Sequence, residues 1–364
     1  MAVYEMIPAS VAPVRQQGIA SWLRNNLFST PLNGVMTLLL LSLLVPPLWS
    51  ALDWLLIKAS WRGDSREACV AGGACWVFIK VRFAQFIYGF YPDDARWRVD
   101  IVFALTALHL AALMIRPIPG KRYWALSFFC LFPGLAFWLL YGGLGLPVVE
   151  THFWGGLMLT LVLAIVGIVA ALPIGILLAL GRRSKMPVVH SICVVFIEFW
   201  RAVPLITVLF MASVMLPLFL SAQVEMDKLL RALIGIILFQ SAYMAEVIRG
   251  GLQAIPKGQY EAAEALGLSY WRSTALVILP QALKITIPSI VNTFIALFKD
   301  TSLVTIIGLF DLLAVGKAGL ADPNWLGYSV EAYTFIALIF WIFCFGMSRY
   351  SQYLERQLNT GHKH

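Results

Sequence analysis

The amino-acid sequence predicts an all-α polytopic membrane protein with about eight transmembrane helices. First, 60% of the 364 residues are hydrophobic and only 13% are charged, whereas an ordinary soluble domain carries about 25% charged residues. Second, several apolar runs reach roughly 20 residues, the length that a helix needs to cross about 30 Å of hydrocarbon. Third, the net charge of +8 comes from basic residues that flank these runs, as orientation signals do. Nucleic acid is therefore not an expected partner.

The first three spans are predicted at residues 34–57, 100–115 and 124–143, within an N-terminal extension of residues 1–149. The run that begins at residue 34 is too long for the apolar segment of a signal peptide, and no small-residue cleavage site clearly follows it, so we expect a retained transmembrane helix. Pro46-Pro47 remove two hydrogen-bond donors from the middle of this helix and predict a kink there.

The loop at residues 58–99, between the first two spans, contains Cys69 and Cys75. The five residues between them, "VAGGA", are small and flexible, so the two β-carbons can reach disulfide distance. The alternative is two free thiols in a loop without a specific role. No Cys or His cluster has the spacing of metal ligands, so no metal site is expected. The scattered histidines also argue against a membrane anchor that holds haem.

Five further spans are predicted in residues 150–364, at 154–180, 188–219, 229–248, 284–310 and 331–348. Two of them, 188–219 and 284–310, are too long for a simple crossing. Each has an interruption, at Pro204 and at Lys299-Asp300. Broken helices at membrane depth are tolerated only where they line a cavity or pack within protein.

The distribution of lysine and arginine predicts that both termini are cytoplasmic. The short outer connections then hold only Lys228, Arg231 and Lys317. Cytoplasmic loops of membrane proteins carry an excess of basic residues. The residues assigned to the inner side are Arg15, Arg24, Arg116, Lys121, Arg122, Arg182, Arg183, Lys185, Arg249, Lys257, Arg272, Lys284, Arg349, Arg356 and Lys363. The loop at 58–99 is an exception, because this orientation places its basic residues in the periplasm.

Polar residues inside the spans predict a substrate path. Glu198 and Arg201 lie three residues apart on one helix face, and Glu198 lies about 17 Å from Pro187 at 1.5 Å per residue, near the midplane. A carboxylate and a guanidinium at one depth match the two charges of an amino acid, or they neutralise each other and hold helices together. Four more polar residues and a proline join the candidate path, which comprises Glu198, Arg201, Pro204, Gln240, Ser241, Tyr243 and Asn292. For Gln240, Ser241, Tyr243 and Asn292, the alternative role is an interhelical hydrogen bond.

Two further groups of polar residues are predicted to be gates. Glu246 and Arg249 lie near the inner end of their span and fit an inner gate or a brace for the following loop. Lys299, Asp300, Thr301 and Ser302 interrupt the span 284–310 and fit an outer gate. The alternative for this second group is a helix break that is satisfied locally.

The loop at residues 256–280, "PKGQYEAAEALGLSYWRSTALVILP", is unusually polar for this chain. Pro256 can open a helix, residues 259–266 favour one, and Gly267 fits the left-handed position that follows a helix end. Ser269 can cap a second helix, and Pro280 is predicted to end or bend it. Taken alone, the loop is either a solvated helical turn or a surface that another protein approaches closely over its alanines.

Glu261-Ala262-Ala263, Gly267, Leu268 and Leu279-Pro280 resemble the EAA signature of binding-protein-dependent ABC importer permeases, with Val277 where that family usually has isoleucine. The segments "IEFWRAVPL" (197–205), "SAYMAEVIRGGLQAIPKGQYEAAEALGLS" (241–269) and "NTFIALFKDTSLVTIIG" (292–308) resemble its polar amino-acid branch. The three-span extension is similar to that of the M-type permease of general L-amino acid uptake systems.

The resemblance implies a function and a set of partners. The last five spans would form a type I ABC importer permease core in a bacterial inner membrane, with the EAA loop as the coupling helix. The partners implied are two ABC ATPase subunits, a second related permease and a periplasmic amino-acid-binding protein. ATP would be bound by the partner ATPases, because the sequence has no GxxxxGK[ST] phosphate loop of its own. The alternative function is an ion-gradient-driven secondary transporter, which would require inverted repeats that the sequence does not show.

Overall fold

The computed structural model describes residues 18–115, 117–219 and 226–358 and is predominantly helical. Arg15, Arg116 and Lys363, which entered the orientation argument, lie outside the described residues. Seven helices in the described residues are long and apolar enough to cross a membrane, and one bent helix pair completes eight. The predicted all-α membrane fold is therefore confirmed. The chain divides into two compact units, Met1–Val77 and Phe78–His364, which are considered separately.

The first unit contains a short helix α1 (Ile19–Asn26) and a long apolar helix α2 (Pro31–Leu52). The hydroxyl of Thr30 caps α2 by accepting a hydrogen bond from the backbone N–H of Asn33 at 3.2 Å. The chain stays helical through Pro46 and Pro47. It departs from α geometry only later, in a π-helical turn at Asp53–Ile57.

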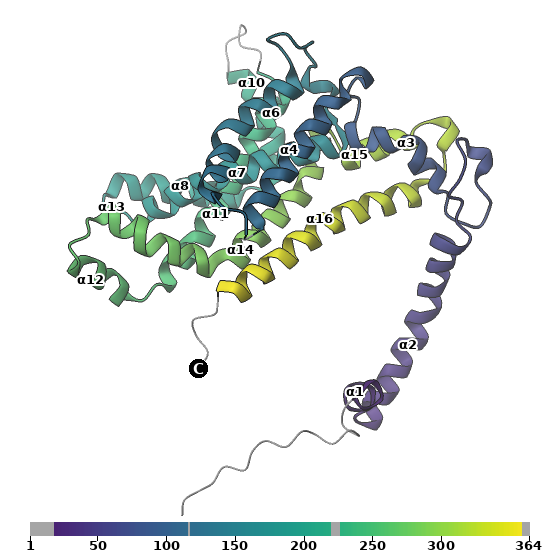
Figure 1. Ribbon diagram of the computed structural model, residues 1–364, viewed down its shortest axis with the longest axis horizontal. Helices are drawn as coiled ribbons and strands as arrows, with labels where there is room; N and C mark the ends of the chain where they lie inside the picture. The colour runs from purple at the N-terminus through teal and green to yellow at the C-terminus, as the bar shows by residue number, and fades with distance from the viewer. Residues whose placement is uncertain (1–17, 116, 220–225, 359–364) are drawn as a thin grey trace, which may run out of the picture. The chain divides into compact units, whose positions relative to one another are not determined.

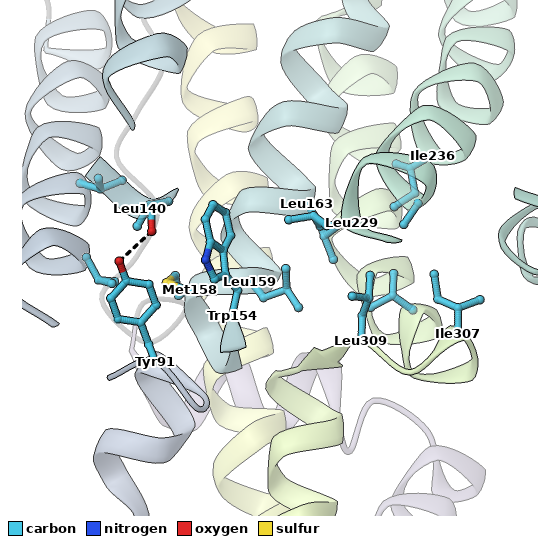
Figure 2. Packing of buried hydrophobic residues seen from close by; sticks show 14 of the residues in the cluster. Tyr91, Leu140, Trp154, Met158, Leu159, Leu163, Leu229, Ile236, Ile307 and Leu309 are labelled. Atoms are coloured by element: carbon cyan, nitrogen blue, oxygen red, sulfur yellow. Dashed lines mark hydrogen bonds between the residues drawn. The ribbon is translucent and has the colours of Figure 1, made fainter. Parts of the chain in front are cut away.

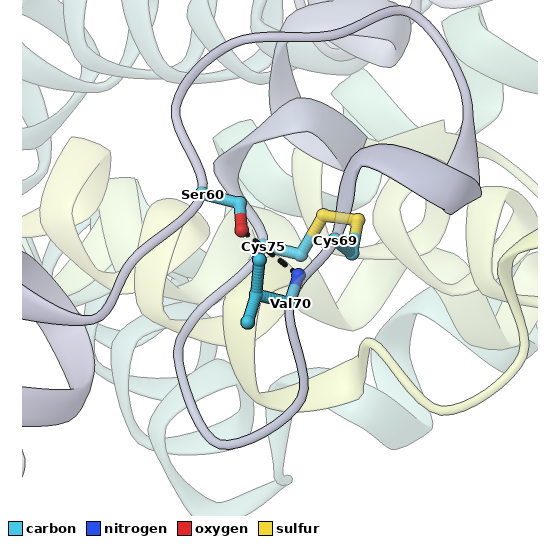
Figure 3. The surroundings of a disulfide bond; sticks show 4 residues. All are labelled: Ser60, Cys69, Val70 and Cys75. Carbon is cyan, nitrogen blue, oxygen red and sulfur yellow. Dashed lines mark hydrogen bonds between the residues drawn. A yellow bond between two sulfur atoms is a disulfide. The ribbon is translucent and has the colours of Figure 1, made fainter.

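The segment after this turn is closed by a disulfide between Cys69 and Cys75 (Figure 3). Their Cα atoms lie 5.4 Å apart, inside the usual range for a disulfide. Ser60 ties the two sides together, because its backbone bonds to Ala74 and Trp76 and its hydroxyl accepts from the N–H of Val70 at 3.0 Å. A β-carbon at Gly73 would lie only 1.9 Å from the carbonyl oxygen of Lys58, so this close approach requires glycine.

A labelling experiment tests the disulfide and the side of the membrane together. In intact right-side-out cells, an impermeant maleimide should label Cys69 only after reduction, because the thiol is otherwise bonded to Cys75 and the loop is expected to face the periplasm. A Cys75→Ser variant is the control, since it should be labelled without reduction. Labelling of the unreduced natural chain would contradict the disulfide, and no labelling of the control would contradict the orientation.

The second unit begins within α3 (Trp76–Tyr88) and continues with α4 (Arg96–Met114). The next span, Lys121–Tyr141, is built from α5 (Lys121–Leu126), a π-helical turn at Ser127–Leu131 and α6 (Phe132–Tyr141). Apolar side chains of these elements form one core with α7 (Gly156–Arg182) and α11 (Lys228–Ala254), as Figure 2 shows. Within this core the hydroxyl of Tyr91 donates to the carbonyl of Leu140 at 2.7 Å. Residues 78–149 and 150–358 thus share a core. The functional division at residues 149 and 150 remains a prediction.

The remaining helices carry the candidate site (Figure 1). Helix α7 (Gly156–Arg182) packs along α11 (Lys228–Ala254), and α11 packs in turn on α14 (Leu279–Asp300). Helix α16 (Ser329–Leu358) lies against α14. A β-carbon at Gly175 of α7 would meet the side chain of Met244 at 2.7 Å, so the backbones of α7 and α11 approach closely through a small residue, as membrane helices commonly do.

The two predicted helix interruptions are both present. Helix α8 (Pro187–Ala202) and the helical segment Leu205–Phe219 meet at 102° around Pro204. This segment consists of α9 (Leu205–Phe210), a π-helical turn at Met211–Met215 and α10 (Leu216–Phe219). Helix α14 changes at Asp300 into a 3₁₀ helix, Thr301–Ile307. A two-residue strand β1 (Phe310–Asp311) and α15 (Leu312–Leu320) connect it to α16.

Candidate functional site

The EAA loop forms a short helix, α12 (Lys257–Ala265), followed by a left-handed glycine. Pro256 stands at the N-cap and Gly267 has a φ of +72°, as the sequence predicted. The N–H of Gly267 bonds to the carbonyl of Glu264, and the N–H of Leu268 bonds to that of Ala263. These bonds close the end of α12 in the manner of a glycine C-cap.

One side of this loop is free. Ala263 is buried against the chain, whereas Glu261, Ala262 and Glu264 are exposed. Beside them lie three large apolar side chains that sequence reasoning missed, because it attributed the surface to alanine alone. They are Leu266, Tyr270 and Trp271, exposed by 78%, 59% and 68% respectively. Exposed apolar side chains of this kind are typical of surfaces that contact another protein or the membrane.

The helix after Gly267 differs from the prediction in two respects. Ser269 occupies the N-cap of α13 (Tyr270–Ser273), but its side chain makes no capping bond. Pro280 does not end the helix, since the chain passes through a π-helical turn at Thr274–Ile278 and enters α14, in which Pro280 lies in the first turn. The proline, which lacks an N–H, thus follows directly on the π-helical turn, where the regular α-helical hydrogen bonding is already interrupted.

Five charged side chains form one cluster around Glu246 of α11. Its carboxylate accepts a two-pronged bond from Arg249, at 2.8 to 3.1 Å, and another from Arg182 at 2.8 Å. Arg201 lies 3.7 Å away, and Arg182 also pairs with Glu198 at 2.9 Å. Glu246 is the most buried member, with a side chain that is 15% exposed. Three arginines therefore surround two glutamates, and the formal charge of the cluster is +1.

This cluster corrects the interpretation of Glu198 and Arg201 as a separate pair. Among the described residues no ion pair joins these two, because Glu198 turns to Arg182 and Arg201 turns to Glu246. Glu198 also lies within ion-pair distance of Arg182, the last residue of α7, and its depth near the midplane stays a prediction. Glu198 and Arg201 of the predicted substrate path thus belong to the same cluster as Glu246 and Arg249 of the predicted inner gate.

The other predicted path residues divide into buried and exposed groups. Gln240 and Ser241 are buried. Gln240 donates to the carbonyl of Thr293 on α14, which is the interhelical bond given above as its alternative, whereas Ser241 donates to the carbonyl of Ile237 within its own helix. Tyr243 and Asn292 are exposed, as is Pro204 at the bend. The guanidinium of Arg201 lies 5.6 Å from the centre of the Tyr243 ring.

The predicted outer gate coincides with the start of the 3₁₀ helix. Thr301 is fully buried and donates to the carbonyl of Phe298 at 2.7 Å, and Ser302 donates to that of Lys299 at 2.9 Å. These bonds satisfy the helix break locally. A gating role for Lys299, Asp300, Thr301 and Ser302 stays a prediction.

Sequence reasoning missed three residues at the end of the bundle that carries α12, namely Arg182, Arg183 and Tyr260. Arg182 and Arg183 were read only as orientation signals, yet Arg182 enters the cluster. Arg183 donates to the hydroxyl of Tyr260 on α12 and to the carbonyl of Leu252 on α11. Arg182 and its partner Glu246, like Arg183 and its partner Tyr260, lie more than 60 positions apart along the chain. Contacts at this separation leave no local pattern in the sequence.

Comparison with known proteins identifies the family. Residues 171–360 match the model of the binding-protein-dependent transport system inner membrane component. The chain is 57% identical to the inner membrane amino-acid ABC transporter permease protein YhdY of Escherichia coli (strain K12), covering 93% of each chain. It is 43% identical to the glutamate/glutamine/aspartate/asparagine transport system permease protein BztC of Rhodobacter capsulatus, covering 99% of this chain and 98% of that one.

A solved structure agrees with these relatives. The crystal structure of an amino acid ABC transporter with histidines is 28% identical and has a TM-score of 0.50, covering 56% of this chain and 92% of that chain. The family match, the near full-length relatives and the helical fold therefore lead to one conclusion: the chain belongs to the family of binding-protein-dependent transport system inner membrane components, the membrane-spanning permeases of ABC importers.

Proposed function

We propose that this chain is the non-catalytic permease subunit of an ATP-driven importer of L-amino acids. The observation that carries the proposal is the exposed coupling loop, in which the EAA residues and the patch of Leu266, Tyr270 and Trp271 face away from the chain. A free surface of this kind supports a docked ATPase, and the sequence contains no phosphate loop of its own. The substrate class is inferred from the relatives, which are named as amino-acid transport proteins.

The proposed assembly contains two ATPase subunits, a second related permease and a periplasmic amino-acid-binding protein. Support for a second permease comes from the exposed polar face formed by Glu198, Arg201, Tyr243 and Asn292. Charged groups inside a transmembrane span cost several kcal/mol when they face lipid, and they normally face a bundle interior or a water-filled path. Another permease chain would cover this face. The proposed location is a bacterial inner membrane with both termini and α12 on the cytoplasmic side.

The substrate path is proposed to run past Arg201 and Glu198. Within the described part of the chain Arg201 makes a single ion-pair contact, with Glu246 at 3.7 Å, and is thereby the least neutralised arginine of the cluster, so it is suited to the α-carboxylate. Glu198 has a side chain that is 54% exposed and pairs only with Arg182 among the described residues, so it is suited to the α-ammonium. The Tyr243 ring beside Arg201 would form one wall. ATP would drive alternating access by binding one conformation better than the other.

Reconstitution in proteoliposomes tests the proposal. Together with its ATPase, second permease and binding protein, this chain should take up amino acids only when ATP is present inside and the loaded binding protein outside. Dissipating the ion gradients should leave uptake unchanged. Uptake that needs an ion gradient and no ATP would refute the proposal in favour of a secondary transporter.

The double replacement Glu198→Gln with Arg201→Gln tests the substrate path. It removes one charge of each sign and leaves the formal charge of the cluster at +1, so the chain should fold. The substrate would lose two hydrogen bonds to charged groups, and its apparent affinity should fall on the order of tenfold or more. Uptake should be measured against substrate concentration for both single variants and the double. Wild-type affinity in the double variant would show that the two charges serve structure alone.

A further inference from the structure

The coupling helix α12 is held to the transmembrane bundle at two places. On one side Gln281 of α14 donates to the side-chain oxygen of Gln259 at 3.0 Å, in an exposed contact. On the other side Tyr260 meets Arg183 and the carbonyl of Leu252. The second contact joins three helices, because Arg183 follows α7, Leu252 belongs to α11 and Tyr260 to α12.

The Tyr260 contact is a closed set of hydrogen bonds. One guanidinium nitrogen of Arg183 donates to the Tyr260 hydroxyl at 2.9 Å and to the Leu252 carbonyl at 3.0 Å. The same hydroxyl donates to the Leu252 carbonyl at 3.2 Å, and the guanidinium carbon lies 5.5 Å from the centre of the tyrosine ring. The tyrosine hydroxyl therefore accepts one bond and donates another, and α12 cannot shift along α11 without stretching both.

Arg182, the neighbour of Arg183, lies in the charge cluster. It bonds to Glu246 of α11 at 2.8 Å and to Glu198 of α8 at 2.9 Å. The backbone carbonyl of Arg182 also lies 2.6 Å from a ring nitrogen of His190 on α8. Two consecutive residues at the end of α7 thus contact different structures, one the coupling helix and the other the proposed substrate path.

We infer that Arg183 and Tyr260 form the positioning contact through which a displacement of α12 reaches α7, and through Arg182 the Glu246 cluster. The inference rests on the proposed function, since it supposes that a partner ATPase moves α12. Arg183 and Tyr260 touch no substrate in this scheme. A chain of contacts establishes coupling only when perturbing one end alters the other, so the decisive property is the coupling ratio between substrate imported and ATP hydrolysed.

The matched variants are Tyr260→Phe, Arg183→Gln and their double, with Lys185→Gln as control. Tyr260→Phe removes only the hydroxyl and keeps the ring. Lys185 lies two residues from Arg183, is exposed, and makes no ion pair or side-chain hydrogen bond among the described residues. Its replacement removes the same charge from the same turn. All variants keep the exposed patch of Leu266, Tyr270 and Trp271.

In proteoliposomes of the complete importer, both single variants should retain the ATPase subunits and basal ATP hydrolysis. The stimulation of hydrolysis by the loaded binding protein and the substrate imported per ATP should each fall on the order of tenfold, as expected for a lost hydrogen bond to a charged group. The double variant should be no worse than the worse single one, because both break the same contact. Lys185→Gln should match wild type.

Three outcomes would overturn the inference. Tyr260→Phe with a wild-type coupling ratio would show that the contact does not transmit motion. Loss of the ATPase subunits from either single variant would show that the contact merely holds α12 in place. Additive losses in the double variant would show two independent effects. The proposed function is tested separately by the wild-type complex, whose uptake must depend on ATP and on the binding protein.

Discussion

Replacing Gly267 with leucine is expected to abolish ATP-driven uptake while leaving the chain folded in the membrane. Gly267 has a φ of +72°, and a non-glycine residue in this conformation costs roughly 1–2 kcal/mol. No atom lies within 4 Å of a β-carbon built at this position, so the leucine causes no clash within the chain. Its side chain instead adds bulk at the exposed end of α12, where the ATPase is proposed to dock.

Purification of the complex and proteoliposome assays measure this effect. The Gly267→Leu chain should be present in the membrane at near wild-type amount, but the ATPase should fail to co-purify, or hydrolysis should lose its stimulation by the loaded binding protein. Gly267→Asn separates strain from bulk, since asparagine tolerates the left-handed conformation. Gly258→Ala is the control within α12, where a β-carbon also meets open space and the backbone is helical. Normal uptake by Gly267→Leu would refute the docking surface.

Replacing Glu246 with glutamine is expected to destabilise the chain more than any other single change in the charge cluster. The substitution keeps the shape of the side chain but leaves Arg182, Arg201 and Arg249 with Glu198 as the only carboxylate of the cluster. Removing one partner of a fully buried ion pair costs about 3–5 kcal/mol, because it leaves uncompensated charge. For Glu246, whose side chain is 15% exposed, we expect a loss at the lower end of this range. Glu198→Gln should cost less, since the Glu198 side chain is 54% exposed and pairs only with Arg182 among the described residues, whereas Glu246 contacts three arginines.

Thermal unfolding in detergent and uptake by proteoliposomes measure the difference. Glu246→Gln should lower the unfolding temperature well below that of Glu198→Gln and should abolish uptake. The double variant Glu246→Gln with Arg249→Gln should recover part of the unfolding temperature, because it removes the arginine that makes the two-pronged bond. If Glu246→Gln and Glu198→Gln unfolded at the same temperature, Glu246 would not be the centre of the cluster.

Features carried by short stretches of chain could be predicted from the sequence. Span number follows from the length of apolar runs, since a helix in lipid must satisfy every backbone polar group within itself. The bend at Pro204 and the left-handed Gly267 follow from the backbone chemistry of proline and glycine. The EAA signature could also be recognised from the sequence, because all of its residues fall within one loop of 25 residues, "PKGQYEAAEALGLSYWRSTALVILP".

The partners of the charged side chains were decided only by tertiary structure. Glu198 and Arg201 share a helix face, and the sequence therefore suggested a pair. In the folded chain α8 packs against both α7 and α11, so Glu198 pairs with Arg182 at the end of α7 and Arg201 contacts Glu246 of α11. Arg183 and Tyr260 likewise meet only in the folded chain. An ion pair depends on a separation of a few ångströms in space, whereas helical periodicity reports only on neighbours within a turn or two.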